Sequence, residues 1–323
     1  MSVFKKIGGA LLVLAVVALA FVWAARTGVL TPDDTTLLAR YGAPNSHFID
    51  VDGQRVHYRD EGTGPAIVLV HGSFGSLRMW NSWAPALTDH YRVVRFDRPP
   101  MGLSSPQPAG SADAAQDEMA IIDRLTRELG IERFFLVGTS SAGLSVAAYA
   151  AEHPERVTGV ILSNVAIGAM KPVRGAMPWT LKLALAIDPW LGGWHPELRW
   201  RGVLQLNFFD PGKVTPAMVR EWTDLNNRAQ RLPRPRFVPS GAMFARTATD
   251  LPRVRVPTLL LWSANDHEFP VETTARGALA ALTATEKKSL VIIERCGHMM
   301  PLECGPESAR AAREFFDREQ TPP

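Results

Sequence analysis

The sequence predicts an α/β fold: a mostly parallel eight-stranded sheet with helices on both faces and a helical cap inserted after the sixth strand. Short apolar runs alternate with amphipathic helical patterns along most of the chain, which is typical of this class. Several runs are apolar throughout, as strands buried on both faces require. The alternation stops over residues 166–254, a Trp- and Pro-rich stretch with only helical periodicity, which we interpret as the cap.

Eight runs are predicted as strands. The first two, His47–Val51 and Gln54–Arg59, flank Asp52-Gly53, a strong hairpin signal. The others are Ala66–Val70, Tyr91–Phe96, Phe134–Val137, Val157–Leu162, Thr258–Trp262 and Leu290–Ile293. Helices are predicted over Leu77–Leu87, Ala114–Leu129, Leu144–Ala151 and Glu307–Phe316. The core therefore comprises residues 46–165 and 255–318, with the cap as an insertion between them and 319–323 as a tail.

The N-terminal segment, residues 1–26, differs from the rest of the chain because most of it is a long apolar run without a charge. Lys5 and Lys6 precede Ile7–Ala25, a run of 19 residues without a charge. At ~1.5 Å per residue this run can cross a hydrocarbon core of ~30 Å. We favour a membrane anchor, with the lysines in the cytoplasm and the rest of the chain outside it. The alternative is a signal peptide that is cleaved, leaving a secreted protein. A buried soluble helix is disfavoured, because the run has no polar face.

A polar stretch, residues 27–45, is predicted to link this segment to the core. The chain carries 35 Lys+Arg and 32 Asp+Glu spread along its length, so no basic block predicts a nucleic-acid partner. The two cysteines, Cys296 and Cys304, exclude a fold built on disulfides. We expect two unpaired buried thiols, and pairing in an oxidising compartment is the alternative.

The strongest candidate site is FFLVGTSSAG, residues 134–143, where a predicted strand meets a predicted helix. Ser140 stands at the corner, with Gly138 two residues before it and Ala142 two after. A nucleophile on a sharp turn needs small residues on both sides, and the helix N-terminus favours developing negative charge. Ser141 is the rival nucleophile, but Thr139 at its −2 position suits a tight turn poorly. We therefore predict Ser140.

The second candidate is HGSFG, residues 71–75, directly after the buried strand Ala66–Val70. A glycine-containing loop there exposes backbone N–H groups at the carboxyl edge of the sheet, where open α/β sheets bind ligands. We expect an oxyanion hole formed by the Ser141 N–H and the Ser73 N–H, with the Phe74 N–H as the alternative to Ser73.

A base and its orienting acid follow later strands. His298 lies in a loop after Leu290–Ile293, and Asp266 follows Thr258–Trp262. The alternative for Asp266 is that it simply caps the helix that follows. The order Ser140, Asp266, His298 nevertheless matches the nucleophile–acid–base order of one large class of hydrolases.

Together these motifs resemble the α/β-hydrolase superfamily from about His47 to Phe316. The resemblance rests on LVHGSFGS, RFDRPPMGLS, VGTSSAG, LLLWSANDHEFP and CGHMMPLE, which occur in the family's order. It implies that Ser140 is the nucleophile, that His298 acts as general base and then acid, and that Asp266 orients His298. Ala142 stands in place of a glycine, and Pro100 replaces the first glycine of the family's D-x-P-G-x-G-x-S loop, which predicts a different backbone path for that loop.

The resemblance implies an esterase-like hydrolase of a small-molecule acyl substrate, without a metal or an organic cofactor. A serine at position 140 argues against haloalkane dehalogenase and epoxide hydrolase chemistry, because those relatives use an aspartate there. The same triad serves C–C bond hydrolases, lactonases, amidases and acyltransferases. A catalytically inactive binding protein on the same fold is the alternative from another class.

Aromatic residues of the cap bear on the substrate. We consider Phe74, Trp179, Trp200 and Phe208 as candidates for lining an apolar pocket. The preferred interpretation of the cap tryptophans is that they attach the cap to the core. Contact with the bilayer is a third possibility, given the predicted anchor.

Overall fold

The computed structural model describes residues 2–106, 114–167, 177–231 and 241–320. Eight strands form one sheet in the order β1-β2-β4-β3-β5-β6-β7-β8. Strands β1 and β2 pair antiparallel, as do β2 and β4, and the remaining neighbours are parallel. This confirms the predicted sheet. The strands are β1 Ser46–Val51, β2 Gln54–Glu61, β3 Ala66–Val70, β4 Arg92–Phe96, β5 Phe134–Thr139, β6 Val157–Ser163, β7 Thr258–Ser263 and β8 Lys288–Ile293.

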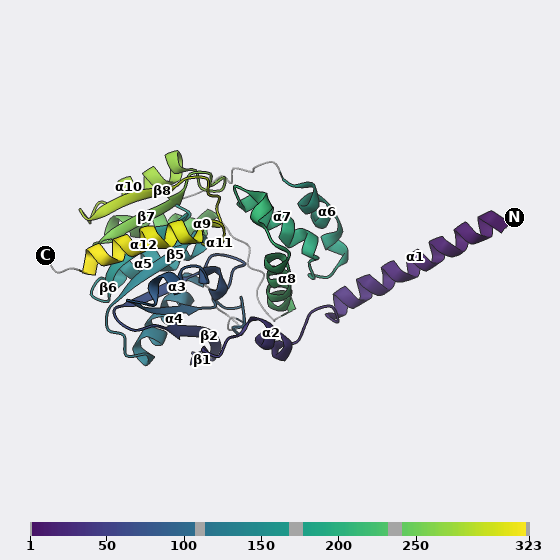
Figure 1. Ribbon diagram of the computed structural model, residues 1–323, viewed down its shortest axis with the longest axis horizontal. Helices are drawn as coiled ribbons and strands as arrows, with labels where there is room; N and C mark the ends of the chain where they lie inside the picture. The colour runs from purple at the N-terminus through teal and green to yellow at the C-terminus, as the bar shows by residue number, and fades with distance from the viewer. Residues whose placement is uncertain (1, 107–113, 168–176, 232–240, 321–323) are drawn as a thin grey trace.

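The sheet is the middle of three layers, because alternate side chains of each strand point to opposite faces. In β3, Val68 packs on one face with α4 and α5, whereas Leu69 packs on the other with α3 and α12. Figure 1 shows the sheet between these helices. The core helical segments are η1 Leu77–Trp80, α3 Ala84–Leu87, α4 Ala114–Glu128, η2 Ser140–Ala142, α5 Gly143–Glu152, η6 Val271–Ala275, α10 Arg276–Ala281, α11 Met300–Glu303 and α12 Gly305–Gln320.

The predicted helix Leu77–Leu87 is two short segments, η1 and α3. Pro85 has no backbone N–H, so it cannot donate the helical bond to the Asn81 carbonyl that a continuous helix would need. The break allows both Trp80 and Trp83 to be fully buried.

The stretch 27–45, predicted as a linker, contains a helix that was not predicted, α2 Asp34–Tyr41. Asp33 caps the helix by accepting a hydrogen bond from the Thr36 N–H at 2.7 Å. Leu37 is buried in a cluster with Leu225 of the cap. The helix was not predicted because the sequence of this stretch is mostly polar and the helix is stabilised by packing against the cap.

The cap covers the carboxyl ends of the strands. Its segments are α6 Trp179–Ile187, η3 Asp188–Trp190, α7 Glu197–Asn207, η4 Pro211–Lys213 and α8 Pro216–Arg231, and residues 168–176 and 232–240 lie outside the described chain. The predicted boundary at 254 also placed α9 Gly241–Asp250 and η5 Leu251–Arg253 in the cap. However, α9 packs against α5, and its Thr247 hydroxyl donates to the Ala166 carbonyl. This part of the insertion therefore packs on the core.

The N-terminal helix α1, Ser2–Thr27, extends away from the rest of the molecule (Figure 1). Residues Lys6–Thr27 are long and apolar enough to cross a membrane, and none of this stretch's most apolar window is buried in the protein. A buried core helix is thereby disfavoured. A signal sequence has the same length and composition, so the membrane anchor remains a proposal.

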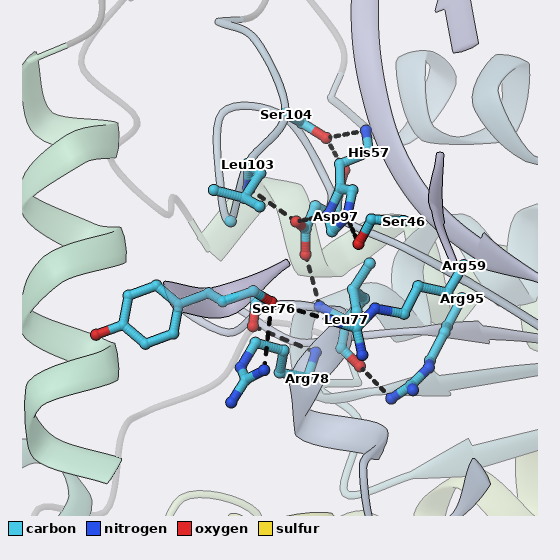
Figure 2. Close-up of polar contacts among 12 residues, drawn as sticks. Ser46, His57, Arg59, Ser76, Leu77, Arg78, Arg95, Asp97, Leu103 and Ser104 are labelled. Carbon is cyan, nitrogen blue, oxygen red and sulfur yellow. Dashed lines mark hydrogen bonds and ion pairs between the residues drawn. The ribbon is translucent and has the colours of Figure 1, made fainter. Parts of the chain in front are cut away.

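The loop after β4 is organised by the buried carboxylate of Asp97 (Figure 2). This carboxylate accepts hydrogen bonds from the Leu77 N–H at 2.6 Å and the Leu103 N–H at 2.8 Å, and it lies 2.7 Å from His57 Nδ1. Burial alone would raise the pKa of Asp97, but the His57 contact and the Leu103 bond lower it overall. Gly102 has a φ of +56°, and a Cβ there would lie 2.1 Å from the Asp97 carboxylate. The Pro99–Pro100 peptide in this loop is cis.

Replacing Asp97 with alanine should lower the free energy of unfolding by about 3–5 kcal/mol, because several buried donors lose one shared acceptor. Asp89→Ala is the matched control, since its partner Arg313 is at the surface, and it should cost under about 1 kcal/mol. Urea unfolding of both variants measures the difference. Equal losses in the two variants would contradict this role of Asp97.

Candidate active site

Ser140 stands at the corner where β5 passes into η2 and α5. Its φ is +54°, in the left-handed region that residues other than glycine rarely adopt. The flanking positions tolerate only small residues. A Cβ on Gly138 would lie 2.7 Å from a methyl of Val146, and one on Gly143 would lie 2.4 Å from a methyl of Val165. The corner therefore presents the Ser140 hydroxyl on a strained, closely packed turn.

In the predicted triad, His298 lies within hydrogen-bond distance of both Ser140 and Asp266. His298 Nε2 is 3.0 Å from Ser140 Oγ, and His298 Nδ1 is 2.8 Å from Asp266 Oδ2. Both His298 and Asp266 are buried. Asp266 Oδ1 also accepts hydrogen bonds from the backbone N–H groups of Glu268 and Phe269. These bonds fix the carboxylate, and the carboxylate in turn fixes the imidazole.

The charge around His298 favours the imidazolium. Burial alone would lower the pKa of His298, but the carboxylates of Asp266 and Glu268 outweigh burial and raise it to about 9. Glu268 Oε2 lies 3.6 Å from His298 Nε2 and its side chain is 45% exposed. Glu268 was not predicted as a site residue, although it stands two residues after Asp266 in the sequence.

The HGSFG loop lies directly against the corner. A Cβ on Gly72 would lie 2.9 Å from Ser140 Cβ and 3.2 Å from the Thr139 carbonyl oxygen, so this close approach requires glycine. The loop and the corner are also joined by a hydrogen bond of 2.8 Å from the Ser73 hydroxyl to the Ser141 hydroxyl. The side chains of Ser73 and Ser141, whose backbone N–H groups are the predicted oxyanion donors, are therefore in direct contact beside Ser140.

Arg98, which was not predicted as a site residue, connects the HGSFG loop to the turn that carries Ser140. Its Nη1 donates to the His71 carbonyl at 2.9 Å and to Ser141 Oγ at 3.0 Å. Its guanidinium also pairs with Glu118, whose other oxygen accepts from the Ser145 hydroxyl. The Ser141 hydroxyl thus lies between Arg98 and Ser73, while Ser140 faces His298. The geometry favours Ser140 over Ser141 as nucleophile.

His71 is buried and holds the same loop from within. The Arg98 N–H lies 2.9 Å from His71 Nε2, so this nitrogen accepts and Nδ1 donates to the Gly72 carbonyl at 2.8 Å. Burial, with the Arg98 charge, lowers the pKa of His71 to about 4. A neutral His71 is consistent with this pattern of one acceptor and one donor nitrogen.

The four candidate pocket residues do not share one environment. Trp200 and Phe208 are buried in a cluster with Met79 and Met299 of the core, which supports the attachment interpretation. Phe74 lies over the Trp200 ring with centroids 5.5 Å apart, beside the predicted oxyanion loop.

Trp179 differs from these residues. It is 71% exposed on the outward side of α6. The sequence did not reveal this placement, because seven of the nine residues of α6 are apolar and its buried side cannot be identified from periodicity.

The loop that carries His298 is fixed by two buried side chains outside the predicted triad. Asn164, at the end of β6, donates to the His298 carbonyl at 3.0 Å. Glu303 accepts from the Gly297 N–H at 2.8 Å and from the Phe209 N–H of the cap at 2.9 Å. Glu303 therefore ties the base-bearing loop to the cap.

Cys296 and Cys304 form a disulfide across this loop, so the expectation of two unpaired thiols is wrong. Both cysteines are buried, as expected. Their eight-residue separation did not show that the chain reverses between Cys296 and α11, which brings their Cα atoms to 6.1 Å.

We compared the chain with protein families, curated proteins and solved structures. The family model described as "alpha/beta hydrolase fold" matches residues 65–303. A Pseudomonas putida 2-hydroxy-6-oxononadienedioate/2-hydroxy-6-oxononatrienedioate hydrolase is 27% identical over 81% of this chain and 91% of its own. Haloalkane dehalogenase 2 of Mycobacterium bovis is 28% identical over 71% of this chain and 80% of its own. The crystal structure of a membrane phospholipase A aligns with a TM-score of 0.68 and 24% identity, covering 98% of this chain and 100% of the other.

The Glu268 carboxylate should raise the pKa of His298 measurably. Glu268→Gln removes a negative charge that stabilises the imidazolium, so the His298 pKa should fall from its value of about 9. Glu272→Gln is the control, because Glu272 pairs with Arg276 at the surface. Imidazole ¹⁵N NMR titration measures the pKa, and an unchanged value in Glu268→Gln would contradict the assignment.

Proposed function

The chain belongs to the α/β-hydrolase family, and we propose that it is a serine hydrolase that cleaves an ester bond of a small, largely apolar substrate through an acyl-enzyme on Ser140. The observation that carries this proposal is the hydrogen-bonded series Ser140 Oγ, His298 Nε2, His298 Nδ1, Asp266 Oδ2. A serine hydroxyl is a weak nucleophile near neutral pH and needs a base in contact with it.

In the first half of the reaction, the unprotonated form of His298 takes the Ser140 proton as the hydroxyl oxygen attacks the carbonyl carbon. Because the pKa of His298 is raised to about 9, the fraction of enzyme in this form increases as the pH rises toward 9. The Asp266 carboxylate accepts from Nδ1–H, which keeps Nε2 free as the acceptor and stabilises the imidazolium that forms. The tetrahedral intermediate collapses when His298 returns the proton to the leaving alcohol oxygen. The acyl group then remains on Ser140.

The developing oxyanion needs donors that are already in position. The Ser141 N–H lies in the first turn of η2, where a backbone N–H has no acceptor within the helix. The Ser73 N–H is the second proposed donor, held near Ser140 by the close approach of Gly72. Water then attacks the acyl carbon, with His298 as the base, and frees Ser140.

Charges near the site favour an uncharged substrate. The carboxylate of Glu268 lies beside His298, and the Arg98 guanidinium is occupied by Glu118 and by two oxygen acceptors. The Pseudomonas relative is named for a substrate with two carboxylates. A dianion placed near Glu268 would be repelled. C–C bond hydrolysis remains the second candidate, because that relative matches most of this chain.

We also propose that α1 remains as an anchor and that the catalytic domain lies outside the cytoplasm. Lys5 and Lys6 precede the apolar run, which favours a cytoplasmic N-terminus. The disulfide between Cys296 and Cys304 supports the same side, since disulfides persist mainly in oxidising compartments. A membrane phospholipase A shares this fold over nearly the whole chain, which is consistent with an anchored hydrolase.

The two adjacent serines provide a matched test. Ser140→Ala should lower kcat on p-nitrophenyl esters by at least about 10⁴-fold and abolish labelling by a fluorophosphonate. Ser141→Ala keeps the nucleophile and loses one acceptor for Arg98 and Ser73, so it should lower kcat by about tenfold and retain labelling. If labelling is instead lost in Ser141→Ala and kept in Ser140→Ala, the proposed nucleophile is wrong.

A further inference from the structure

Apart from Thr180 and Lys182, helix α6 is apolar on its outward side as well as on its inward side. Thr180, Leu181 and Ala184 are buried against the cap. On the opposite side, Trp179 is 71% exposed and Leu183 is 48% exposed. A surface helix of a soluble domain carries polar residues on that side, and a helix that is apolar all round is normally covered. We call the outward side of α6 together with η3, residues 179–190, the cap face.

The cap face carries little charge. Lys182 is exposed and positively charged, whereas Asp188 pairs with both His195 and Arg199. Trp190 in η3 extends the apolar surface and is 67% exposed. A surface of tryptophan and leucine with a lysine and no unpaired acid matches the interfacial layer of a membrane, where tryptophan and basic residues are enriched.

The cap face lies next to the end of α1. Phe21 of α1 packs edge-on against Trp194, with ring centroids 5.6 Å apart. The Arg26 side chain reaches the Trp190 carbonyl at 3.5 Å, and a Cβ on Gly192 would lie 2.9 Å from Arg26. In Figure 1, α1 leaves the molecule on the side of the cap where α6 lies, away from the sheet.

If α1 crosses a membrane, these contacts determine how far the cap lies from the bilayer centre. The apolar segment ends at Thr27, six residues after Phe21, which is about 9 Å along a helix axis. If Lys6–Thr27 crosses a hydrocarbon core of ~30 Å, Phe21 lies at or below its outer boundary. Trp194 contacts Phe21, so the neighbouring cap segment lies at the boundary between the hydrocarbon core and the lipid headgroups.

We propose that the cap face rests in the interfacial layer of the same membrane that α1 crosses. The occupant of this surface is therefore lipid. Aromatic contacts continue from here toward the site: His195 packs on Trp200 at 6.0 Å, and Trp200 packs on Phe74 beside the oxyanion loop. The cap thus joins the membrane surface to the site, which favours a lipid-dissolved ester as substrate. This last step alone rests on the proposed function.

Depth measurement on the full chain in phosphatidylcholine nanodiscs tests the contact. A nitroxide is attached at Leu183→Cys, and Ala186→Cys on the same side of α6 repeats the measurement. Val291→Cys is the control, because Val291 is exposed on β8 at the far side of the sheet. The native cysteines are joined to each other and do not react.

At 183 and 186 the nitroxide should collide more with dissolved oxygen than with a water-soluble nickel chelate, and at 291 the order should reverse. Preference for the chelate at 183 and 186 would overturn the proposal. Exclusion of both reagents there would also overturn it, since a second copy or another protein would then cover the face.

Measurements of ester hydrolysis provide a second, independent test of the proposal. Leu183→Asp should lower hydrolysis of an ester embedded in phosphatidylcholine vesicles severalfold and leave p-nitrophenyl acetate turnover unchanged. Equal rates of the variant and the native chain on the vesicle ester would contradict delivery from the membrane. If the native chain hydrolyses neither ester, the proposed function fails, while the nitroxide depths still decide whether the cap face touches lipid.

Discussion

The close approach of two loops at Ser140 is the constraint on which the rest of the site depends. Ser140 has a left-handed backbone, and the Gly72 Cα lies so near it that one added carbon would meet Ser140 Cβ at 2.9 Å. Bringing these loops together requires small residues on both, a neutral His71 inside one of them, and Arg98 bound to both. His298 and Asp266 then need only to be placed opposite the hydroxyl, at the ends of neighbouring strands.

Much of this arrangement could be predicted, because it is encoded locally. The eight strands follow from apolar runs bounded by turn signals, and the corner follows from small residues around Ser140. Asp266 and His298 follow from their positions after β7 and β8, where parallel strands bring their ends to one edge.

The parts that escaped prediction depend on contacts between distant segments. Arg98, Asn164 and Glu303 are ordinary polar residues in the sequence, and only the fold brings them beside the site. Helix α2 was missed because its stability comes from packing on the cap. The exposure of Trp179 was missed because a helix with apolar residues on most of its surface gives little indication of which side turns outward.

The cap contacts the catalytic core on one side and lies near α1 on the other. Its inner side packs Trp200 and Phe208 against the core, and Glu303 ties it to the loop of His298. Its outer side faces the direction in which α1 leaves (Figure 1). In the proposed arrangement, the nucleophile lies on the sheet and the cap face lies at the membrane surface, so that different layers of one chain carry out the chemistry and the contact with lipid.

The central claim is that Ser140 becomes acylated, and mass spectrometry of the enzyme during turnover tests it most directly. The full chain, mixed with a slowly hydrolysed p-nitrophenyl ester and quenched with acid within the first turnover, is digested and its peptides are weighed. If Ser140 is the nucleophile, the peptide that contains it gains the mass of the acyl group, and fragmentation assigns that mass to Ser140. Release of nitrophenol in a burst while every serine peptide keeps its native mass would contradict the claim.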